Sequence, residues 1–126
     1  MDDVVGPDEA VGEWRLSEAA NLVLAEIAER AAQSDAEGIP RSEIDALAGV
    51  GLLGSALEPA ARQREVAERI AMADASVWFC WAQHQTPMKT LETAQPADYA
   101  PLVDEIKARW LPGLQDGRFL GSVAFA

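Results

Sequence analysis

The sequence predicts an all-α fold, a five-helix up-and-down-type bundle with one β-strand at its C-terminal end. Apolar residues recur every three or four positions in five segments of residues 14–117, which is the period of a helix with one buried face. Glycine and proline stand between these segments, where helices begin and end. Hydrophobic residues make up 49% of the 126-residue chain, enough for one domain to bury a core without disulfides.

Two helices are predicted after a flexible leader over residues 1–13. The first covers about residues 16–34 and the second about residues 40–50. The tripeptide 38–40, Gly-Ile-Pro, separates them, because glycine accepts a left-handed helix end and proline suits a first turn. The residues expected on the two buried faces are Leu16, Ala20, Val23, Ile27, Ala31, Ile44, Leu47 and Ala48.

The third and fourth helices are predicted to follow each other closely. The third begins near Pro59 and turns Val66 and Ile70 inward. Asp74-Ala-Ser76 then supplies capping residues, and the fourth helix covers about residues 76–93. This helix is apolar on most sides, which is typical of a central, buried helix.

The fifth helix is predicted over residues 97–110, closed by Pro112-Gly113. Leu102, Ile106 and Trp110 recur every four residues along it, with Val103 beside them. Residues 118–126 then read as a β-strand, and a strand needs a neighbour to pair its backbone groups. Since no other segment offers one, we expect the partner strand on another chain or in a further part of a longer protein.

Charge is distributed unevenly along the chain, whose net charge is −11. Residues 1–58 hold 13 acidic and 3 basic side chains, a net charge of −10, whereas residues 59–126 hold 8 and 7, a net charge of −1. An acidic surface repels phosphate backbones, which excludes nucleic acid as a partner. No apolar run reaches the length of a membrane span. The single cysteine, Cys80, excludes an intrachain disulfide and fits a cytoplasmic location.

A search for chemistry finds no catalytic constellation. His84 is the only histidine and has no cysteine or histidine at metal-ligand spacing, so it cannot build a zinc site. The segment Gly49–Gly54 has the letters Gly-x-Gly-x-x-Gly, but it ends a helix and follows no strand, so the dinucleotide-binding context is missing. We expect neither catalytic nor metal-binding residues.

The fourth helix carries the candidate binding residues. Its polar residues Gln83, His84 and Gln85 interrupt an apolar sequence, and buried polar groups need hydrogen-bond partners. One interpretation is a ligand pocket with aromatic walls and a few polar groups. The other is a core helix whose polar edge meets solvent or a neighbouring helix. The candidate pocket residues are Trp78, Trp81, His84 and Gln85.

The order of several motifs resembles the acyl-CoA dehydrogenase family. Ala32–Pro40 looks like the exit of the family's first helix, and Glu43–Leu53 is similar to its second helix. Val66–Ser76 looks like the third helix and the turn before the buried fourth. Leu111–Gly117 resembles the family's Leu-Pro-x-Leu-x-x-Gly, which precedes the first strand of its β-domain. The resemblance covers about residues 16–126.

The resemblance implies the helical N-terminal domain of an FAD-dependent oxidoreductase that acts on acyl thioesters. It implies that Phe125 and Ala126 neighbour the flavin, and that a β-domain and a C-terminal helical domain, or a partner flavoprotein subunit, complete the enzyme as a homo- or hetero-oligomer. The family's catalytic glutamate comes from that C-terminal domain, so the chain alone is not expected to catalyse. The loop over residues 54–59 is shorter than the family's Gly-rich loop.

Two alternatives remain open on the sequence. The chain can be the N-terminal part of a related flavin-dependent monooxygenase, which the helical domain does not distinguish from a dehydrogenase. It can also be a standalone acidic helical interaction module without a cofactor, whose terminal strand adds to the sheet edge of a partner.

Overall fold

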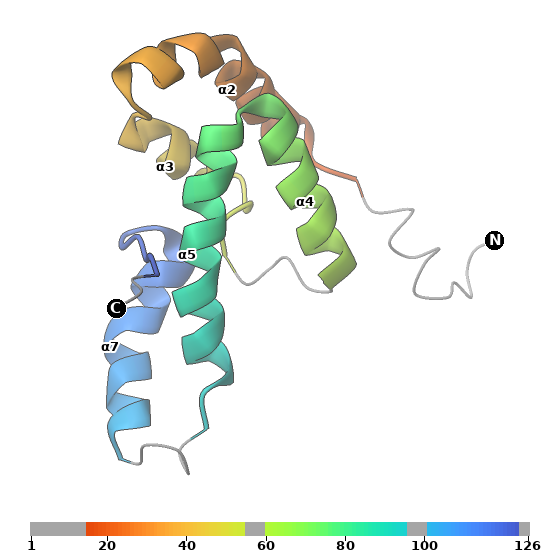
Figure 1. Cartoon of the computed structure of the whole chain (residues 1–126). Helices are drawn as coiled ribbons and strands as arrows, with labels where there is room; N and C mark the ends of the chain where they lie inside the picture. Colours follow the sequence, from red (N-terminus) through yellow and green to blue (C-terminus); the bar gives the residue numbers. More distant parts are fainter. Residues whose placement is uncertain (1–14, 55–59, 96–100, 124–126) are drawn as a thin grey trace, which may run out of the picture.

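The computed structural model describes residues 15–54, 60–95 and 101–123, and its regular secondary structure in these ranges is entirely α-helical (Figure 1). The predicted order of five helices is confirmed there, with bounds that differ from the expected ones by a few residues. The leader over residues 1–13 lies outside the described ranges. The helices are α2 (Glu18–Glu37), α3 (Arg41–Gly49), α4 (Ala60–Ala73), α5 (Ala75–Thr93) and α7 (Leu102–Asp116).

Side-chain caps and glycine explain where the helices begin and end. Ser17 caps α2, its hydroxyl oxygen accepting the amide of Ala20 at 3.0 Å. The carboxylate of Asp74 accepts the amides of Ser76 and Val77 at 2.8 and 3.2 Å and so begins α5 immediately after α4. Gly117 ends α7 in the left-handed conformation at φ 84°, which glycine adopts without steric cost.

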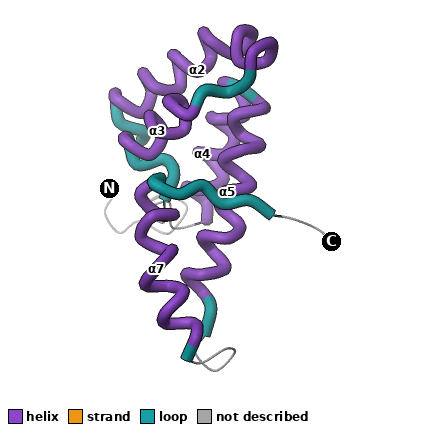
Figure 2. Tube along the Cα trace, turned by 90° about the vertical axis from the view of Figure 1, so that its left-hand side faces the viewer, coloured by secondary structure: helices purple, strands orange, loops and turns teal. Residues whose placement is uncertain are grey.

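The helices pack around α5, which contacts α3, α4 and α7. Helices α4 and α5 form an antiparallel hairpin, and α7 runs back along the second half of α5 (Figure 1). Helices α2 and α3 lie over the end where α4 and α5 join (Figures 1 and 2). No helix among the described residues is long and apolar enough to cross a membrane.

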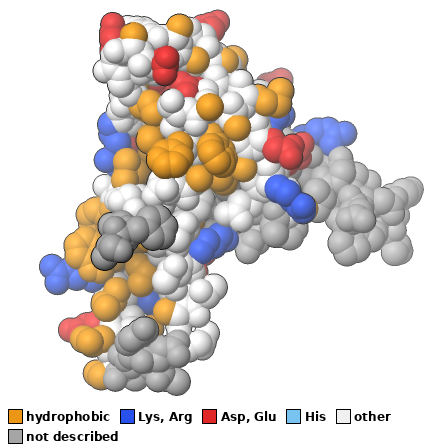
Figure 3. Space-filling model, viewed as in Figure 1, with side chains coloured by type: hydrophobic (Ala, Val, Ile, Leu, Met, Phe, Trp, Pro, Cys, Tyr) orange, Lys and Arg blue, Asp and Glu red, His pale blue; other side chains and the backbone are white. Residues whose placement is uncertain are grey.

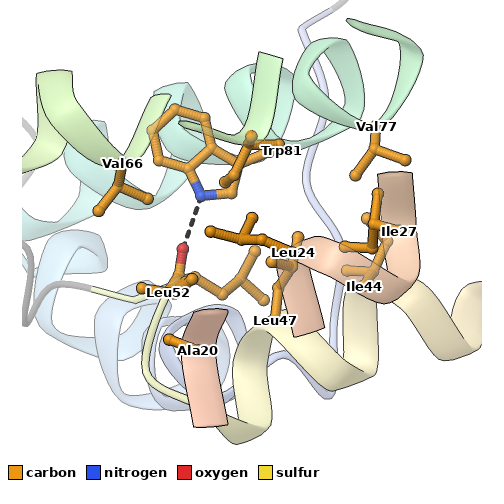
Figure 4. Packing of buried hydrophobic residues seen from close by; sticks show 11 residues of the cluster. Ala20, Leu24, Ile27, Ile44, Leu47, Leu52, Val66, Val77 and Trp81 are labelled. Carbon is orange, nitrogen blue, oxygen red and sulfur yellow. Dashed lines mark hydrogen bonds between the residues drawn. The ribbon is translucent and has the colours of Figure 1, made fainter. Parts of the chain in front are cut away.

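The main core is built from α2 to α5 and the turn after α3 (Figure 4). The buried faces predicted for the first three helices supply six of its eleven members, because side chains three and four residues apart share a helix face. A buried hydrogen bond of 2.8 Å from the Ser34 hydroxyl to the Glu43 carboxylate also joins α2 to α3. The core members are Ala20, Leu24, Ile27, Ile44, Leu47, Leu52, Leu53, Val66, Ile70, Val77 and Trp81.

Helix α7 differs from the prediction at its end and in its buried face. It continues through Pro112 to Asp116, because the left-handed Gly117 provides its stop four residues after the expected Pro112-Gly113. The apolar series Leu102, Ile106 and Trp110 remains 54%, 40% and 42% exposed, whereas the buried side chains of α7 include Val103 and Leu114.

The β-strand expected over residues 118–126 is not formed in its described part, residues 118–123. These residues cross α5 as a loop after α7 ends (Figure 2). Their alternate amides are bonded without any strand: Phe119 donates to the Gly113 carbonyl, Gly121 to His84 and Val123 to Gln83, each at 3.0 Å. The expectation of a strand was wrong for this segment. Its amides bond to a carbonyl of α7 and to two side chains of α5, and not to a neighbouring strand.

Candidate functional site

Helix α5 holds all four candidate pocket residues, and they differ in how far they are buried. Trp81, His84 and Gln85 are buried, with Val77 and Met88 on the same side of the helix. Trp78 stands seven residues before Gln85, near it on the helix surface, but is 37% exposed. Three of the four candidates are therefore buried, and Trp78 reaches the surface.

Trp81 and Gln85 both bind the turn that follows α3. The Trp81 indole nitrogen donates to the carbonyl of Leu52 at 2.7 Å (Figure 4), and the Gln85 amide donates to the carbonyl of Leu53 at 2.9 Å. Gln63 of α4 in turn donates to the Gln85 side-chain oxygen at 3.3 Å. Residues four apart lie one above the other on a helix. Trp81 and Gln85 therefore attach the turn to two successive turns of α5.

His84 joins α5 to the end of α7 and to the segment after it. Its Nε2 lies 2.8 Å from the carbonyl oxygen of Leu114, and its Nδ1 accepts the amide of Gly121 at 3.0 Å. A carbonyl only accepts and an amide only donates, so both contacts require the neutral tautomer with hydrogen on Nε2. Protonation of Nδ1 would place a donor against a donor and remove the bond to Gly121.

The electrostatics of His84 agree with this tautomer. Burial lowers the pKa of the imidazole from its usual 6.5, the bond to Leu114 raises the pKa, and the positive charge of Arg41 lowers it again, with a net lowering. The neutral form is thus favoured in the folded chain.

This lowered pKa predicts a loss of stability in weak acid. Below about pH 6.5 the imidazole of His84 binds a proton in the unfolded chain more readily than in the folded chain, because its pKa is lower when folded. The stabilisation by neutral His84 is therefore complete above that pH and is lost as the pH falls through the folded pKa. Urea unfolding at about pH 7.5 and 5.5 should show a smaller stability difference between the wild-type protein and His84→Gln at the lower pH. Parallel pH profiles for the two proteins would contradict the assignment.

The sequence did not predict that Gln83 and Gly121 both take part in docking residues 118–123 on α5. The Gln83 side-chain oxygen accepts the amide of Val123 at 3.0 Å, one step along from the His84–Gly121 bond. Gly121 approaches so closely that a Cβ at this position would lie 2.4 Å from the Pro87 side chain, which only glycine avoids. The run of polar residues within an apolar helix signalled that partners were needed, but not which segment would supply them.

The outer face of α5 exposes an aromatic surface. Phe79 is 57% exposed, and Cys80 beside it is also exposed. The helix was expected to be buried on most sides, and this part of it is not. Figure 3 shows hydrophobic side chains gathered over the first turns of α5 and over α7. The candidate flavin neighbours Phe125 and Ala126 lie outside the described residues.

Two hollows among the described residues are lined by residues other than the four candidates. One of about 190 Å³ lies between α2 and α3 and includes Glu43, and one of about 250 Å³ lies between α5 and α7, lined by Leu91, Leu102 and Ile106 among others. Among the residues that the structure describes, no group of three His, Cys, Asp or Glu side chains is placed to hold a metal ion.

Comparison with protein-family models, with curated proteins and with solved structures finds no match to this chain. The resemblance to acyl-CoA dehydrogenases therefore stays a prediction from the sequence motifs.

Proposed function

We propose that this chain serves as the helical domain of an acyl-CoA dehydrogenase-like, FAD-dependent oxidoreductase and helps to enclose the pocket for flavin and acyl-CoA. The order of motifs from Ala32 to Gly117 supports the proposal. The remaining β and C-terminal helical domains, on the same polypeptide or on a partner flavoprotein subunit, would complete the enzyme. A cytoplasmic location belongs to the same proposal.

The observation that carries the proposal is the path of residues 118–123 to the outer face of α5. The segment reaches Gln83 through the amide of Val123, and Phe79 lies one helical turn before Gln83 on the same side. Exposed aromatic side chains of this kind favour contact with a ligand or another domain. The chain would thus contribute an aromatic wall, formed by Trp78 and Phe79, rather than a reacting group.

His84 has no free ring nitrogen for proton transfer to a substrate. Nε2 faces the Leu114 carbonyl and Nδ1 accepts the Gly121 amide, whereas a general base must reach the proton it removes. This arrangement supports a chain that shapes a pocket and does not catalyse by itself.

Flavin binding tests the proposal. The purified chain is expected to bind no stoichiometric FAD, whereas the enzyme completed by its further domains or its partner subunit is expected to bind FAD and to oxidise an acyl-CoA. Stoichiometric FAD on the isolated monomer, or a completed assembly without flavin, would refute the proposal. Substrate oxygenation by the completed enzyme would instead identify the related monooxygenase.

A matched pair of variants tests the aromatic wall in the completed enzyme. Phe79→Ala is expected to raise KM for acyl-CoA by at least about fivefold, because a lost apolar contact costs on the order of 1–3 kcal/mol. Leu22→Ala changes a similarly exposed apolar residue on α2 and should leave KM unchanged. Equal effects of the two substitutions would place the wall elsewhere.

The second candidate function is a standalone acidic interaction module. The net charge of −10 over residues 1–58 favours it, since such a surface attracts basic partners. A flavin-free monomer that melts in one cooperative transition and stays flavin-free with every neighbouring flavoprotein subunit would favour this function.

A further inference from the structure

The segment after α7 is attached to the bundle in two parts of different chemistry. Residues 118–123, which we call the strap, begin after the left-handed Gly117 and cross α5 (Figure 2). The Asp116 carboxylate accepts the amide of Arg118 at 3.0 Å and its Nε at 2.8 Å. The Arg41 side chain of α3 donates to the carbonyls of Gly117 and Arg118. Bonds to charged side chains therefore hold the start of the strap, and neither an arginine nor an aspartate with a lowered pKa titrates near neutral pH.

Neutral groups hold the other end of the strap. The amide of Gly121 donates to His84 Nδ1 and the amide of Val123 donates to the Gln83 side-chain oxygen, both at 3.0 Å. Gly121 also lies directly on α5, since a Cβ at this position would lie 2.4 Å from the Pro87 side chain. Of these contacts, only the one with His84 involves a group that titrates near neutral pH. The proton state of this ring therefore decides how firmly the end of the strap is attached.

The two ring nitrogens of His84 respond in opposite ways to a proton. Nε2 donates to the Leu114 carbonyl at 2.8 Å, and Nδ1, which carries no hydrogen, is where the proton binds. The imidazolium still donates to Leu114, through a stronger charge-assisted bond. Its new N–H group at Nδ1 would face the N–H of Gly121, which cannot accept it. Protonation therefore preserves the contact between α5 and α7 and removes the contact with the strap.

Charged side chains near the latching ring come from α3, α5, α7 and the strap. They form three pairs, Arg41 with Asp45, Lys89 with Glu92, and Asp116 with Arg118. Burial is the main cause that lowers the pKa of His84, the bond to Leu114 opposes it, and the positive charge of Arg41 lowers it further. The closed strap therefore favours neutral His84, and a proton on the ring favours the open strap.

From these contacts we propose that His84 is a proton-operated latch on the strap. In weak acid its protonation releases residues 121–123 from α5, while residues 118 and 119 and the described helices stay in place. Release uncovers the surface of α5 around Pro87, on which Gly121 lies, and at neutral pH the ring closes the strap again. The latch acts within the folded chain, so it is distinct from the loss of stability in acid. It needs neither flavin nor acyl-CoA, so it stands apart from the proposed function.

Amide exchange measured by NMR on the full chain at about pH 7.5 and about pH 5.5 tests the latch. After correction for intrinsic rates, opening at Gly121 and Val123 should rise severalfold at the lower pH, with a ceiling of about tenfold set by the ordinary histidine pKa of about 6.5. The amide of Phe119, which bonds to the Gly113 carbonyl, should not change. His84→Gln does not titrate and should remove the pH dependence. Equal opening of Gly121 at both pH values, or the same rise at Phe119 as at Gly121, overturns the proposal.

Linkage requires the reverse effect as well, so that opening the strap must raise the pKa of His84. Gly121→Ala forces the strap away, because its Cβ would lie 2.4 Å from Pro87, and leaves the ring in place. The pKa of this single histidine, measured by NMR titration, is expected to rise toward 6.5. Gly49→Ala is the matched control and should leave the pKa unchanged, because nothing lies within 4 Å of an added Cβ there. An unaltered pKa in Gly121→Ala, or the same rise in both variants, contradicts the latch.

Discussion

Trp81→Ala is expected to lower the free energy of unfolding by about 3–5 kcal/mol. Trp81 is buried in the main core, and its indole nitrogen donates to the Leu52 carbonyl at 2.7 Å. The substitution removes a large apolar contact, leaves a cavity and deprives the turn after α3 of a bond to α5. Domains of this size are stabilised by only about 5–15 kcal/mol, so the substitution should remove a large share of the total stability.

Two companion substitutions separate packing from hydrogen bonding. Trp81→Phe keeps most of the ring and should cost about 1–3 kcal/mol, chiefly for the Leu52 carbonyl left without its donor. Phe79→Ala alters an exposed ring on the same helix and should cost less than about 1 kcal/mol. Urea unfolding measures all three. Similar losses for Trp81→Ala and Phe79→Ala would contradict the position of Trp81 in the core.

The same Trp81 variant distinguishes the two interpretations of the candidate pocket. Within the proposed function, a changed substrate affinity or chain-length preference of the reconstituted enzyme would support a pocket wall at Trp81. Unchanged kinetics together with lowered stability would support a core residue, as its burial and its bond to Leu52 favour.

His84→Phe is the second substitution with a large expected effect, a loss of about 2–4 kcal/mol. Phenylalanine fills a similar volume but leaves both the Leu114 carbonyl and the Gly121 amide without the partners that His84 provides. His84→Gln retains a donor and an acceptor on the side chain and should lose less. The order of stability is expected to be wild type, His84→Gln, His84→Phe.

Hydrogen exchange locates this effect in the segment after α7. The amide of Gly121 should lose its protection in His84→Phe, since His84 Nδ1 is its acceptor. Gln83→Ala is the matched control, because it removes the acceptor of the Val123 amide and leaves that of Gly121 in place. Undiminished protection of Gly121 in His84→Phe would show that another group holds the segment.

Local sequence features were sufficient to predict most of the helical framework. The cap of α5 was predicted at Asp74, which accepts amides two and three residues away, and the buried positions Ile44 and Ile70 follow the helical period. Ser17 caps α2 through an equally local bond to Ala20, one position after the residue where that helix was expected to begin. Such interactions connect near neighbours in the chain, so they can be inferred without knowing the fold.

The candidate site was predictable only as a need for hydrogen bonds. The run Gln83 to Gln85 within an apolar helix required partners, but these lie 22 to 40 residues away, at Gln63, Leu53, Leu114, Gly121 and Val123. The path of the chain after Gly117 decides the contacts to Gly121 and Val123, and the turn after α3 decides the contact to Leu53. The periodicity of the sequence predicts neither path.

The sequence by itself determined the helices, their order and the concentration of negative charge in the first half of the chain, since these depend on composition and on neighbours along the chain. Only the tertiary structure decided which apolar face of α7 is buried and where residues 118–123 bind. Val103 packs inward while Ile106 stays exposed, and His84 and Gln83 take the amides that a neighbouring strand would have taken. Both outcomes depend on how α7 docks on α5, a non-local choice between surfaces of similar hydrophobicity.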